Sequence, residues 1–435
     1  MANDPNTIQY VIQEDGFWYI ASKEKNPYVP ELTVSAKGVA NGLSTEYNDG
    51  YDFGPDTYDP TSTATPPYTQ TSGIQEAINY VFNKGMGSGT VYGATSFGRI
   101  KLKSGIFDVS DNIVMPSHVS LIGSGMAYST IRYLGTGQAI QIPDVNNSIS
   151  YFNKLKGFSI YLGDSPDNTV SGVVANTISQ SSFEDLSITD VGTYGIEISP
   201  NVGGQNLTAI RNCAIIGTHS GSTNSIGIQY GNPLTTNTNG SGNGYILQSI
   251  LQSLTKGMIF GSLAGQILID LPYFENITGT LMQFGLNLGN YRNVSNITVN
   301  RLIPIGTLAS PAIQVNDDAT DIVFNNPSLN STSFNSITAG HLQVHNANDM
   351  PTGFAITTPA LPTATGSANA IVNTFPYTIR IYQNHSTLTS LGSHIIDISG
   401  NDKLLPDDPS ELMLDPGCKI YYATAVPASW IWYGA

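Results

Sequence analysis

The sequence predicts an all-β solenoid, in which short strands form the sides of stacked coils. Segments such as residues 100–103 and 107–109 alternate apolar and polar side chains, which is the pattern of half-buried strands. Turn-forming residues fill the gaps between these segments and leave no room for a helix. A related pattern returns at spacings of about 23 to 33 residues, and a period in this range is typical of a solenoid.

Two elements recur between about residue 99 and residue 344. One is an apolar step that Gly, Ala or His introduces, at residues 139–142, 172–174, 195–198, 227–230, 257–260, 312–315 and 341–344. The other comes before it, in the segments LKGFSI, FEDLSI, IRNCAI, VSNITV and ATDIVF. A single unit of this kind cannot bury its apolar face, but stacked units share one continuous core. Each buried Ile, Leu, Val or Phe contributes roughly 1.5–3 kcal/mol to that core.

The chain before the solenoid divides into an arm and a helix. Residues 1–70 open with an aromatic strand pattern and continue into a stretch rich in Pro, Asp, Gly and Tyr, which predicts an irregular arm used for attachment. Ser72 and Gln75 then form a capping box, apolar residues follow at helical spacing, and Gly85 ends the segment. An amphipathic helix at this place would cover the open end of the solenoid, which spans residues 71–350.

The pattern changes after about residue 350. A transition rich in Pro, Thr and Gly leads to five short strand patterns, whose turn spacing predicts a small antiparallel β-sandwich over residues 351–435. Trp430 and Trp432 lie two positions apart on the last of these strands and therefore share one face. Two interpretations stay open for this pair: a buried domain core, which we favour, or an exposed platform on which a sugar stacks.

Composition limits the partners of the chain. Charged residues make up only 11% of the sequence, and the formal net charge of −15 argues against nucleic acid, because phosphate binding needs clustered Lys and Arg. The same charge disfavours a polyanionic substrate, although a local basic groove would evade that argument. The 40% of hydrophobic residues predict a folded chain.

Neither a metal nor a cofactor is expected. Cys213 and Cys418 lie far apart, no metal-binding spacing occurs, and the six His residues show no ligand pattern. The GMGSG segment follows its helix and lacks a Gly-Lys-Ser/Thr ending, so it is not a phosphate loop. The first residues show no secretory signal pattern, and no stretch approaches the length of apolar residues that spans a membrane.

The segments SGIQEAINYV and GRIKLKSGIFDVSDNIVMPSHVSLIGSGMAYSTIRY, with the irregular coils after them, resemble the pectate-lyase-like right-handed parallel β-helix superfamily. Pectinases, viral tailspikes and surface proteins share this type of first coil. The resemblance implies a right-handed parallel β-helix over roughly 250 residues. It says little about activity, because function resides in sites that differ among proteins of one fold.

The resemblance also suggests where catalysis would lie. Polygalacturonases of this superfamily carry N-T-D, D-D, G-H-G and R-I-K motifs in that order. Asp317 and Asp318 match the second motif and His341 part of the third, but SNITVN stands in place of the first and no R-I-K follows. We therefore expect a binding protein and not an enzyme. If it is an enzyme, a glycoside hydrolase with paired carboxylates is expected, with candidates Asp317, Asp318, Glu184, Asp185 and Glu197.

The preferred hypothesis is a tailspike or spike protein of a virion, which binds a glycan or a protein on the surface of a host cell. Tailspikes of this fold imply a homotrimer on the virion surface, with an N-terminal arm that contacts other virion proteins. Because SWIWYGA is strongly aromatic, we also expect residues after about 350 to contribute to the subunit interface. The alternatives are a polysaccharide-degrading enzyme and a cellular surface adhesion protein.

Overall fold

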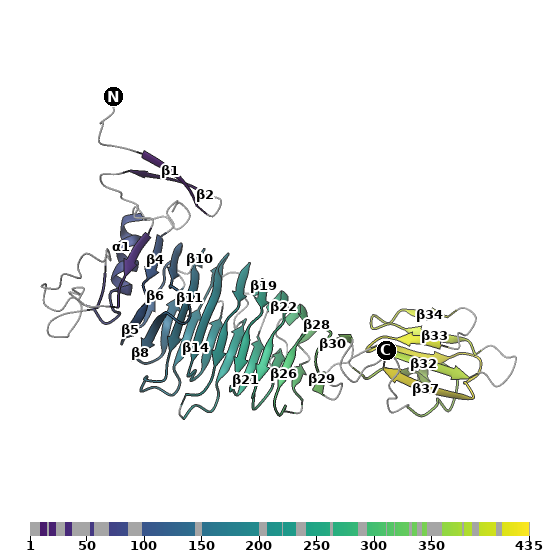
Figure 1. Cartoon of the computed structure of the whole chain (residues 1–435). Coiled ribbons are helices and arrows are strands. Elements are labelled where there is room, and N and C mark those ends of the chain that lie inside the picture. The colour runs from purple at the N-terminus through teal and green to yellow at the C-terminus, as the bar shows by residue number, and fades with distance from the viewer. Residues whose placement is uncertain are drawn as a thin grey trace, which may run out of the picture.

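The structure is a computed structural model with 37 strands and one α-helix among its named elements. It describes residues 9–14, 17–22, 31–36, 53–55, 69–85, 98–143, 150–199, 207–219, 221–231, 241–261, 264–285, 294–309, 311–316, 318–329, 333–336, 342–345, 359–375, 378–384, 391–405 and 411–434. In these ranges, no helix has the length and apolar character needed to cross a membrane. The strands from β3 to β30 stack along one axis as successive coils (Figure 1).

The coils form three parallel sheets, and each coil passes through them in turn. Sheet 1 contains β3 (Glu31–Val34), β4 (Gly98–Leu102), β7 (Val119–Ile122), β11 (Lys154–Tyr161), β14 (Ser182–Thr189), β16 (Thr208–Arg211), β19 (Ser241–Leu247), β22 (Ala264–Asp270), β25 (Val294–Asn300), β28 (Ala319–Asn325) and β30 (Leu342–His345). Sheet 2 contains β5 (Gly105–Val109), β8 (Ser129–Tyr133), the second halves of β11 and β14, β17 (Ala214–Ile216), β20 (Ile250–Gln252), β23 (Tyr273–Glu275) and β26 (Ile303–Ile305).

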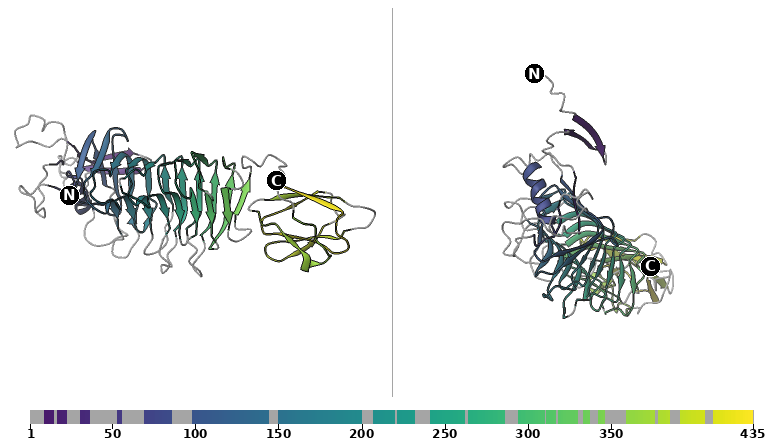
Figure 2. Two further views of the ribbon diagram at one scale, coloured as in Figure 1. Left: turned by 90° about the horizontal axis from the view of Figure 1, so that it is seen from below. Right: turned by 60° about the vertical axis from the view of Figure 1, so that its left-hand side comes forward.

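Sheet 3 is nine-stranded and contains β6 (Ile113–Val114), β9 (Gln138–Ile142), β12 (Ser171–Ala175), β15 (Tyr194–Ile198), β18 (Ile226–Tyr230), β21 (Lys256–Phe260), β24 (Met282–Phe284), β27 (Ile313–Val315) and β29 (Phe334–Ser336). A short pair, β10 (Ser150–Tyr151) and β13 (Ile178–Ser179), precedes sheet 1 in two coils. Every strand of the three sheets pairs in parallel with the equivalent strand of the next coil (Figure 2). Crossovers between parallel strands are right-handed in nearly all proteins, and the chain is a right-handed parallel β-helix.

The two recurring sequence elements are confirmed as coil sides. The apolar step forms the strands of sheet 3, and the element before it forms sheets 1 and 2. The last step is an exception. Leu342 and Val344 pair with Ile322 and Phe324 of β28, so residues 342–345 belong to sheet 1, and our assignment of residues 341–344 to the apolar step was wrong. The apolar alternation alone could not distinguish the two sheets, because both bury every second residue.

Aromatic side chains align inside the last coils. Phe260 and Phe284 are neighbours in sheet 3 and stack with ring centroids 5.0 Å apart and an interplanar angle of 7°. Phe324 of sheet 1 meets Phe284 edge to face at 5.9 Å and Phe334 at 5.2 Å. These rings are buried, and the chain of contacts connects sheets 1 and 3 across the interior. These aromatic contacts therefore stabilise the stacking of neighbouring coils.

The corners between sheets are single residues with a left-handed backbone. At the bend between sheets 1 and 2 the strand register aligns Gly157, Asp185, Asn212, Gln248, Leu271, Arg301 and Asn326, with φ between 50° and 70°. A second row of left-handed residues precedes the strands of sheet 1 in the earlier coils and lies inside β19, β22, β25 and β28 in the later ones: His118, Phe152, Gln180, Leu207, Asn243, Gln266, Asn296 and Asp321. The left-handed conformation costs free energy for residues other than Gly. Because the same bend recurs in every coil, the strands of neighbouring coils stay in register.

Position 248 allows a test of this bend. Gln248 has φ of 52° and an exposed side chain, so its substitution changes little but the backbone preference. We expect Gln248→Val to lower the free energy of unfolding by about 1–2 kcal/mol, because a β-branched residue disfavours this conformation. Gln248→Gly at the same position should leave it unchanged or slightly higher. Thermal unfolding of the two variants measures the difference, and equal melting temperatures would contradict the bend.

The capping helix α1 (Ile74–Gly85) covers the first coil, as predicted, and buries Ile74, Ala77 and Ile78. The predicted capping box is wrong in detail. Thr71, not Ser72, caps the helix, because its Oγ1 accepts a hydrogen bond from the Gln75 backbone and donates one to Glu76.

The two residues predicted for the box connect the helix to the solenoid. Ser72 donates to the Asp108 carbonyl in β5. The side chain of Gln75 exchanges two hydrogen bonds with the backbone of Val114 in β6. These contacts fix the helix against the end of the first coil.

Part of the expected arm belongs to the solenoid. The strands β1 (Gln9–Glu14) and β2 (Phe17–Ser22) form an antiparallel hairpin. In contrast, β3 pairs in parallel with β4, and Leu32 and Val34 are buried in the core. The segment 1–70 is therefore not all arm, because β3 extends sheet 1 over the first coil.

Two small antiparallel sheets form the C-terminal region. One contains β31 (Ile371–Val372), β36 (Lys419–Tyr422), β33 (Ser393–Ile396) and β34 (Asp402–Leu404); the other contains β35 (Glu411–Leu414), β32 (Ile379–Asn384) and β37 (Ser429–Gly434). A short 3-10 helix, η4 (Ser367–Asn369), precedes β31. The Tyr422 hydroxyl donates to Gln383 of the other sheet, and this bond joins the two layers of a small sandwich.

The two tryptophans lie inside this sandwich. Trp430 is 6% exposed and Trp432 is fully buried, their rings meet edge to face at 5.2 Å, and the Trp430 indole donates to the Pro359 carbonyl. The interpretation of Trp430 and Trp432 as a sugar-stacking platform is therefore wrong, because neither ring face is open to a ligand. The aromatic run also gives no support to a subunit interface, since the domain covers these two rings itself.

Candidate functional site

The outer surface of sheet 3 carries one aligned column of mostly polar side chains. On each strand the residue after an inward-facing apolar side chain points outward, and the strand register places these residues one above another. From β9 to β27 they are Gln141, Val174, Glu197, Gln229, Ile259, Gln283 and Gln314. Adjacent strands lie about 4.8 Å apart, so the column extends over roughly 29 Å. We call it the amide column.

Hydrogen bonds orient the carboxamides of this column. Gln229 and Gln283 each donate from Nε2 to the carbonyl two residues later, over 3.1 and 3.2 Å. Gln314 donates to Asn316 Oδ1, and Gln141 accepts a bond from Asn112. Gln229 is buried, whereas Gln141, Gln283 and Gln314 are half-buried. The amides are therefore held in fixed positions, which lowers the entropy cost of binding a ligand with many hydroxyl groups.

Glu197 occupies the middle of the amide column. Burial raises the pKa of its carboxyl group above the ordinary value, and a hydrogen bond with Ser199 opposes this only in part. Tyr194, at the start of the same strand, also has a raised pKa, first from its own burial and then from the charge of Glu197. A partly desolvated carboxyl group of this kind can hold its proton to a higher pH and donate it.

The raised pKa of Glu197 predicts a pH-dependent stability. The native state disfavours the ionised carboxylate, so the resulting penalty is present above the folded pKa and disappears as the pH falls below the ordinary value of 4.5. We expect Glu197→Gln to raise the free energy of unfolding by about 1–2 kcal/mol near pH 8 and to change it little at pH 4. Denaturant titrations at the two pH values measure this, and a variant that is less stable at pH 8 would contradict it.

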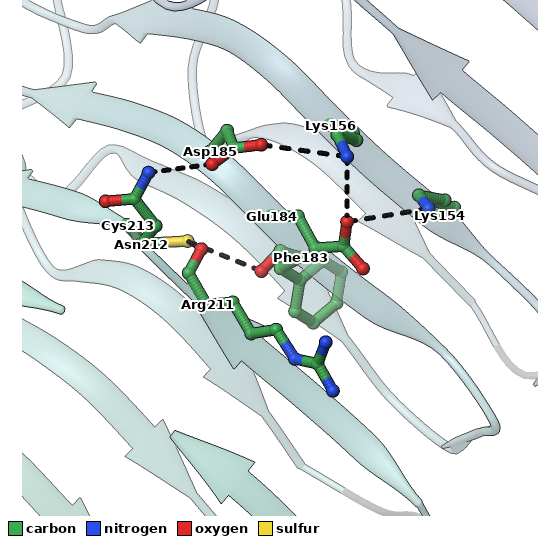
Figure 3. Close-up of polar contacts among 8 residues, drawn as sticks. All are labelled: Lys154, Lys156, Phe183, Glu184, Asp185, Arg211, Asn212 and Cys213. Carbon is green, nitrogen blue, oxygen red and sulfur yellow. Dashed lines mark hydrogen bonds and ion pairs between the residues drawn. The ribbon is translucent and has the colours of Figure 1, made fainter. Parts of the chain in front are cut away.

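Glu184 and Asp185 lie elsewhere, at the bend between sheets 1 and 2 (Figure 3). Glu184 Oε2 lies 3.3 Å from the Lys156 ammonium and 3.5 Å from that of Lys154. Asp185 lies 3.8 Å from Lys156 and accepts a hydrogen bond from Asn212. The burial of Glu184 acts to raise its pKa, but Lys154, Ser182 and Lys156 together outweigh this and hold the pKa below its ordinary value. Glu184 is therefore ionised at neutral pH and cannot serve there as a general acid.

The other residues that match the hydrolase motifs, and Asp321 beside them in the sequence, lie at a turn, at a bend or outside the described part of the chain. Asp317 and His341 are outside the described residues. Asp318 is half-buried, and its carboxylate lies against Gly285, where an added Cβ would come within 1.9 Å of Asp318 Oδ1. Asp321 is exposed at a left-handed corner. Among the described residues, the structure does not bring Glu197 together with another candidate, because Glu184 and Asp185 belong to different sheets from it.

The described part of the chain contains neither a cluster of metal ligands nor an exposed thiol. Within the described ranges, no group of three or more His, Cys, Asp and Glu side chains could hold a metal ion. Cys213 and Cys418 are both free and buried. Burial raises the pKa of the Cys213 thiol to about 12, and its Sγ lies 3.5 Å from the Phe183 carbonyl, so it behaves as a small core residue.

The amide column was not predicted, although the sequence contained its signal. The third position of the apolar step is Gln in residues 139–142, 227–230 and 312–315, and Glu in residues 195–198. In a stacked parallel solenoid, equivalent positions of successive repeats align, so the recurring Gln predicts an amide row on one face.

The comparisons with known proteins give only distant similarity. No protein-family model and no curated protein sequence matches the chain. Among solved structures, the A-module of the mannuronan C-5 epimerase AlgE6 from Azotobacter vinelandii is 13% identical, with a TM-score of 0.47 over 63% of this chain and 68% of that chain.

Two viral proteins are similar over nearly the whole chain. A mutant tailspike protein of E. coli bacteriophage HK620, in complex with a pentasaccharide, is 8% identical, with a TM-score of 0.42 over 98% of this chain and 96% of that chain. ORF18 of Geobacillus virus E2 is 11% identical, with a TM-score of 0.37 over 98% of this chain and 86% of that chain.

The strand register assigns the fold class of the protein. Three parallel sheets, single-residue bends between sheets 1 and 2 and a helix over the first coil define a right-handed parallel β-helix. This fold class is the one that the sequence predicted, together with the small antiparallel sheets at the C-terminal end.

Proposed function

We propose that the chain is a surface spike protein of a virion that binds a neutral glycan on a host cell through the amide column. The observation that carries this proposal is a set of four oriented carboxamides, those of Gln141, Gln229, Gln283 and Gln314, in a column that extends over roughly 29 Å. Carboxamides donate and accept hydrogen bonds without charge, and sugar hydroxyls do the same. A surface-exposed host protein is the other ligand that the proposal allows.

The residues of the amide column fit the binding of a glycan better than they fit its hydrolysis. Hydrolysis of a glycosidic bond by paired carboxylates requires two such groups on opposite sides of the scissile bond. Within the described strands of sheet 3, Glu197 is the one acidic residue of the amide column, and its neighbours in register are Val174 and Gln229. The ionised Glu184 does not lie on this sheet. The column therefore offers hydrogen bonds to a glycan but only one of the two catalytic groups.

A glycan array tests the proposal, with a reducing-end assay on each ligand that binds. We expect binding without release of new reducing ends. Gln283→Ala removes a half-buried amide of the column and should weaken binding about three- to tenfold. Gln343→Ala removes an exposed amide of sheet 1 and serves as the matched control. The absence of any glycan ligand would refute glycan binding, and an equal effect of the two variants would refute binding through the column.

The raised pKa of Glu197 supports one alternative, a glycoside hydrolase in which this carboxyl group is the general acid. New reducing ends that disappear in Glu197→Gln, while glycan binding persists, would establish this alternative. Activity that survives the substitution would exclude Glu197 as the acid.

We also propose that the spike is a homotrimer attached through its N-terminal arm. Exposed apolar side chains of the C-terminal sheets support association there: Ile398 is 66% exposed, Leu404 59% and Met413 47%. Light scattering should give about three times the chain mass of 46.4 kDa. The triple variant Ile398→Ser, Leu404→Ser, Met413→Ser should lower that mass, and a wild-type monomer at micromolar concentration would contradict the trimer.

A further inference from the structure

Sheet 2 exposes an apolar surface over its last four strands. On β17, β20, β23 and β26 the outward side chains are mostly aliphatic or aromatic, and the strand register aligns them in two columns. Ile250, Ile303 and Ile305 are 43%, 36% and 48% exposed. Each step from strand to strand is about 4.8 Å, so this surface extends over roughly 14 Å along the solenoid. We call its apolar residues the isoleucine face: Ala214, Ile216, Ile250, Tyr273, Ile303 and Ile305.

The same two columns are polar in the coils before the isoleucine face. From β8 to β14 every outward residue of the columns carries a polar group: Thr130, Arg132, Ser159, Tyr161, Ser187 and Thr189. Single exposed apolar side chains are common on protein surfaces. Here, however, apolar residues replace polar ones at successive equivalent positions, and the replacement begins between β14 and β17. A change of this kind indicates a surface suited to contact with another molecule.

The edge of sheet 2 disfavours the addition of a further strand. In the described ranges β26 is the last strand of this sheet, and its central residue is Pro304. Ile303 donates its backbone N–H back to the Pro272 carbonyl of the preceding coil. Successive N–H groups of a strand point to opposite sides, so the N–H that Pro304 lacks would lie on the open side of β26. A strand added there would lose a ladder hydrogen bond, which leaves the face, and not the edge, for contact.

We propose that the isoleucine face is a contact between copies of this chain that run in parallel. The proposal rests on the homotrimer proposed above and names a surface that holds its solenoids together. Most soluble oligomers consist of identical chains in a closed, symmetric arrangement. Apolar residues with few charges are typical of permanent contacts between such chains.

The charges around the isoleucine face favour another copy over a lipid surface. Protein segments that lie on membranes usually carry Lys or Arg beside their apolar residues. The described outward residues of β17, β20, β23 and β26 include neither, and Glu275 is the one charged residue among them. Its carboxylate accepts a hydrogen bond from the Tyr273 hydroxyl over 3.3 Å. Arg301, at the bend before β26, is paired with Asp270 over 2.7 Å.

The size of the isoleucine face favours the parallel arrangement. A stable contact buries roughly 800 Å² on each partner, and a strip roughly 14 Å long supplies only part of this area. Ile398, Leu404 and Met413 of the C-terminal sheets are also exposed, and Figure 1 shows these sheets beyond the last coils. Parallel copies bring both surfaces to the same level in every chain, whereas an antiparallel pair would separate them. Cyclic symmetry closes such an assembly.

Light scattering on the full chain tests the contact. The double variant Ile250→Lys, Ile303→Lys places two ammonium groups on the isoleucine face, and burying them in a contact is unfavourable. We expect its mass at micromolar concentration to fall from about three times 46.4 kDa toward that of one chain. Ile106→Lys is the matched control, because Ile106 is 57% exposed in the same column on β5, outside the face. It should keep the mass of the wild type, and circular dichroism checks that both variants fold.

The reaction of a surface thiol locates the contact without disrupting it. In the oligomer, Ile305→Cys should react with a disulfide reagent at least about tenfold more slowly than Ile106→Cys, because a contact would cover it. The wild type serves as the blank, since Cys213 and Cys418 are both buried.

Several results would overturn the proposal. In an oligomeric wild type, equal reactivity of the two introduced thiols, an undiminished mass of the double Lys variant, or an equal loss of mass in Ile106→Lys would each reject the isoleucine face and leave the homotrimer standing on other surfaces. A monomeric wild type would reject both the contact and the homotrimer. A monomer that floats with phosphatidylcholine vesicles, and no longer does so as the double Lys variant, would assign the face to a lipid surface instead.

Discussion

Ile196→Asp is expected to prevent stable folding of the solenoid. Ile196 is fully buried, and its register neighbours Val173 and Ile228 are equally enclosed. A carboxylate at this position would have only apolar surroundings within its sheet, and an unpaired buried charge costs several kcal/mol. We expect a fall in melting temperature well beyond ten degrees, or no folded protein.

The neighbouring position provides the control for Ile196→Asp. Glu197→Asp introduces the same side chain one residue later, where the strand points to the outer surface and already carries a carboxyl group. We expect its melting temperature to stay within a few degrees of the wild type. Similar effects of the two variants, or a melting temperature of Ile196→Asp within two degrees of the wild type, would show that the register of sheet 3 is wrong.

Phe284→Ala is expected to have the second largest effect. Phe284 touches Phe260 on one side and Phe324 on the other, so its removal empties the centre of the aromatic chain between sheets 1 and 3. Truncation of a buried Phe to Ala usually costs about 3–5 kcal/mol, from lost burial and from the cavity left behind. Thermal and denaturant unfolding should both show this loss.

Phe284→Leu separates the aromatic contacts from simple burial. Leu refills most of the space but cannot stack on Phe260, so we expect about a third to a half of the loss in Phe284→Ala. If Phe284→Ala changes the free energy of unfolding by less than about 1 kcal/mol, the interior is not packed as described.

The coil sides could be predicted from the sequence because each strand leaves a local signal. In Gly195 to Ile198 the alternation of Ile196 and Ile198 with Glu197 marks one buried face, and the repeat shows that such faces stack. The capping helix was predictable for the same reason, since Ile74, Ala77 and Ile78 recur at helical spacing. The signals of the coil sides and of the helix come from residues close together in the sequence, and they can therefore be predicted from it.

The bends could not be predicted from single residues. Leu271 and Arg301 adopt the left-handed conformation that Gly and Asn prefer, because the coils above and below impose it. The ionisation state of each acidic candidate also depends on residues that are distant in sequence. Lys154 and Lys156 of the preceding coil help to lower the pKa of Glu184, whereas burial raises the pKa of Glu197. The residues next to Glu184 and Glu197 in the sequence could not show that their pKa values shift in opposite directions.

One measurement tests the central claim most directly: a crystal structure of the full chain with the tightest-binding neutral oligosaccharide from the array. The account predicts sugar density along the outer surface of sheet 3, with hydroxyl groups within hydrogen-bond distance of the Gln283 and Gln314 side chains and no sugar bond cleaved. Density on the C-terminal sandwich, or on another sheet with the amide column unoccupied, would contradict it.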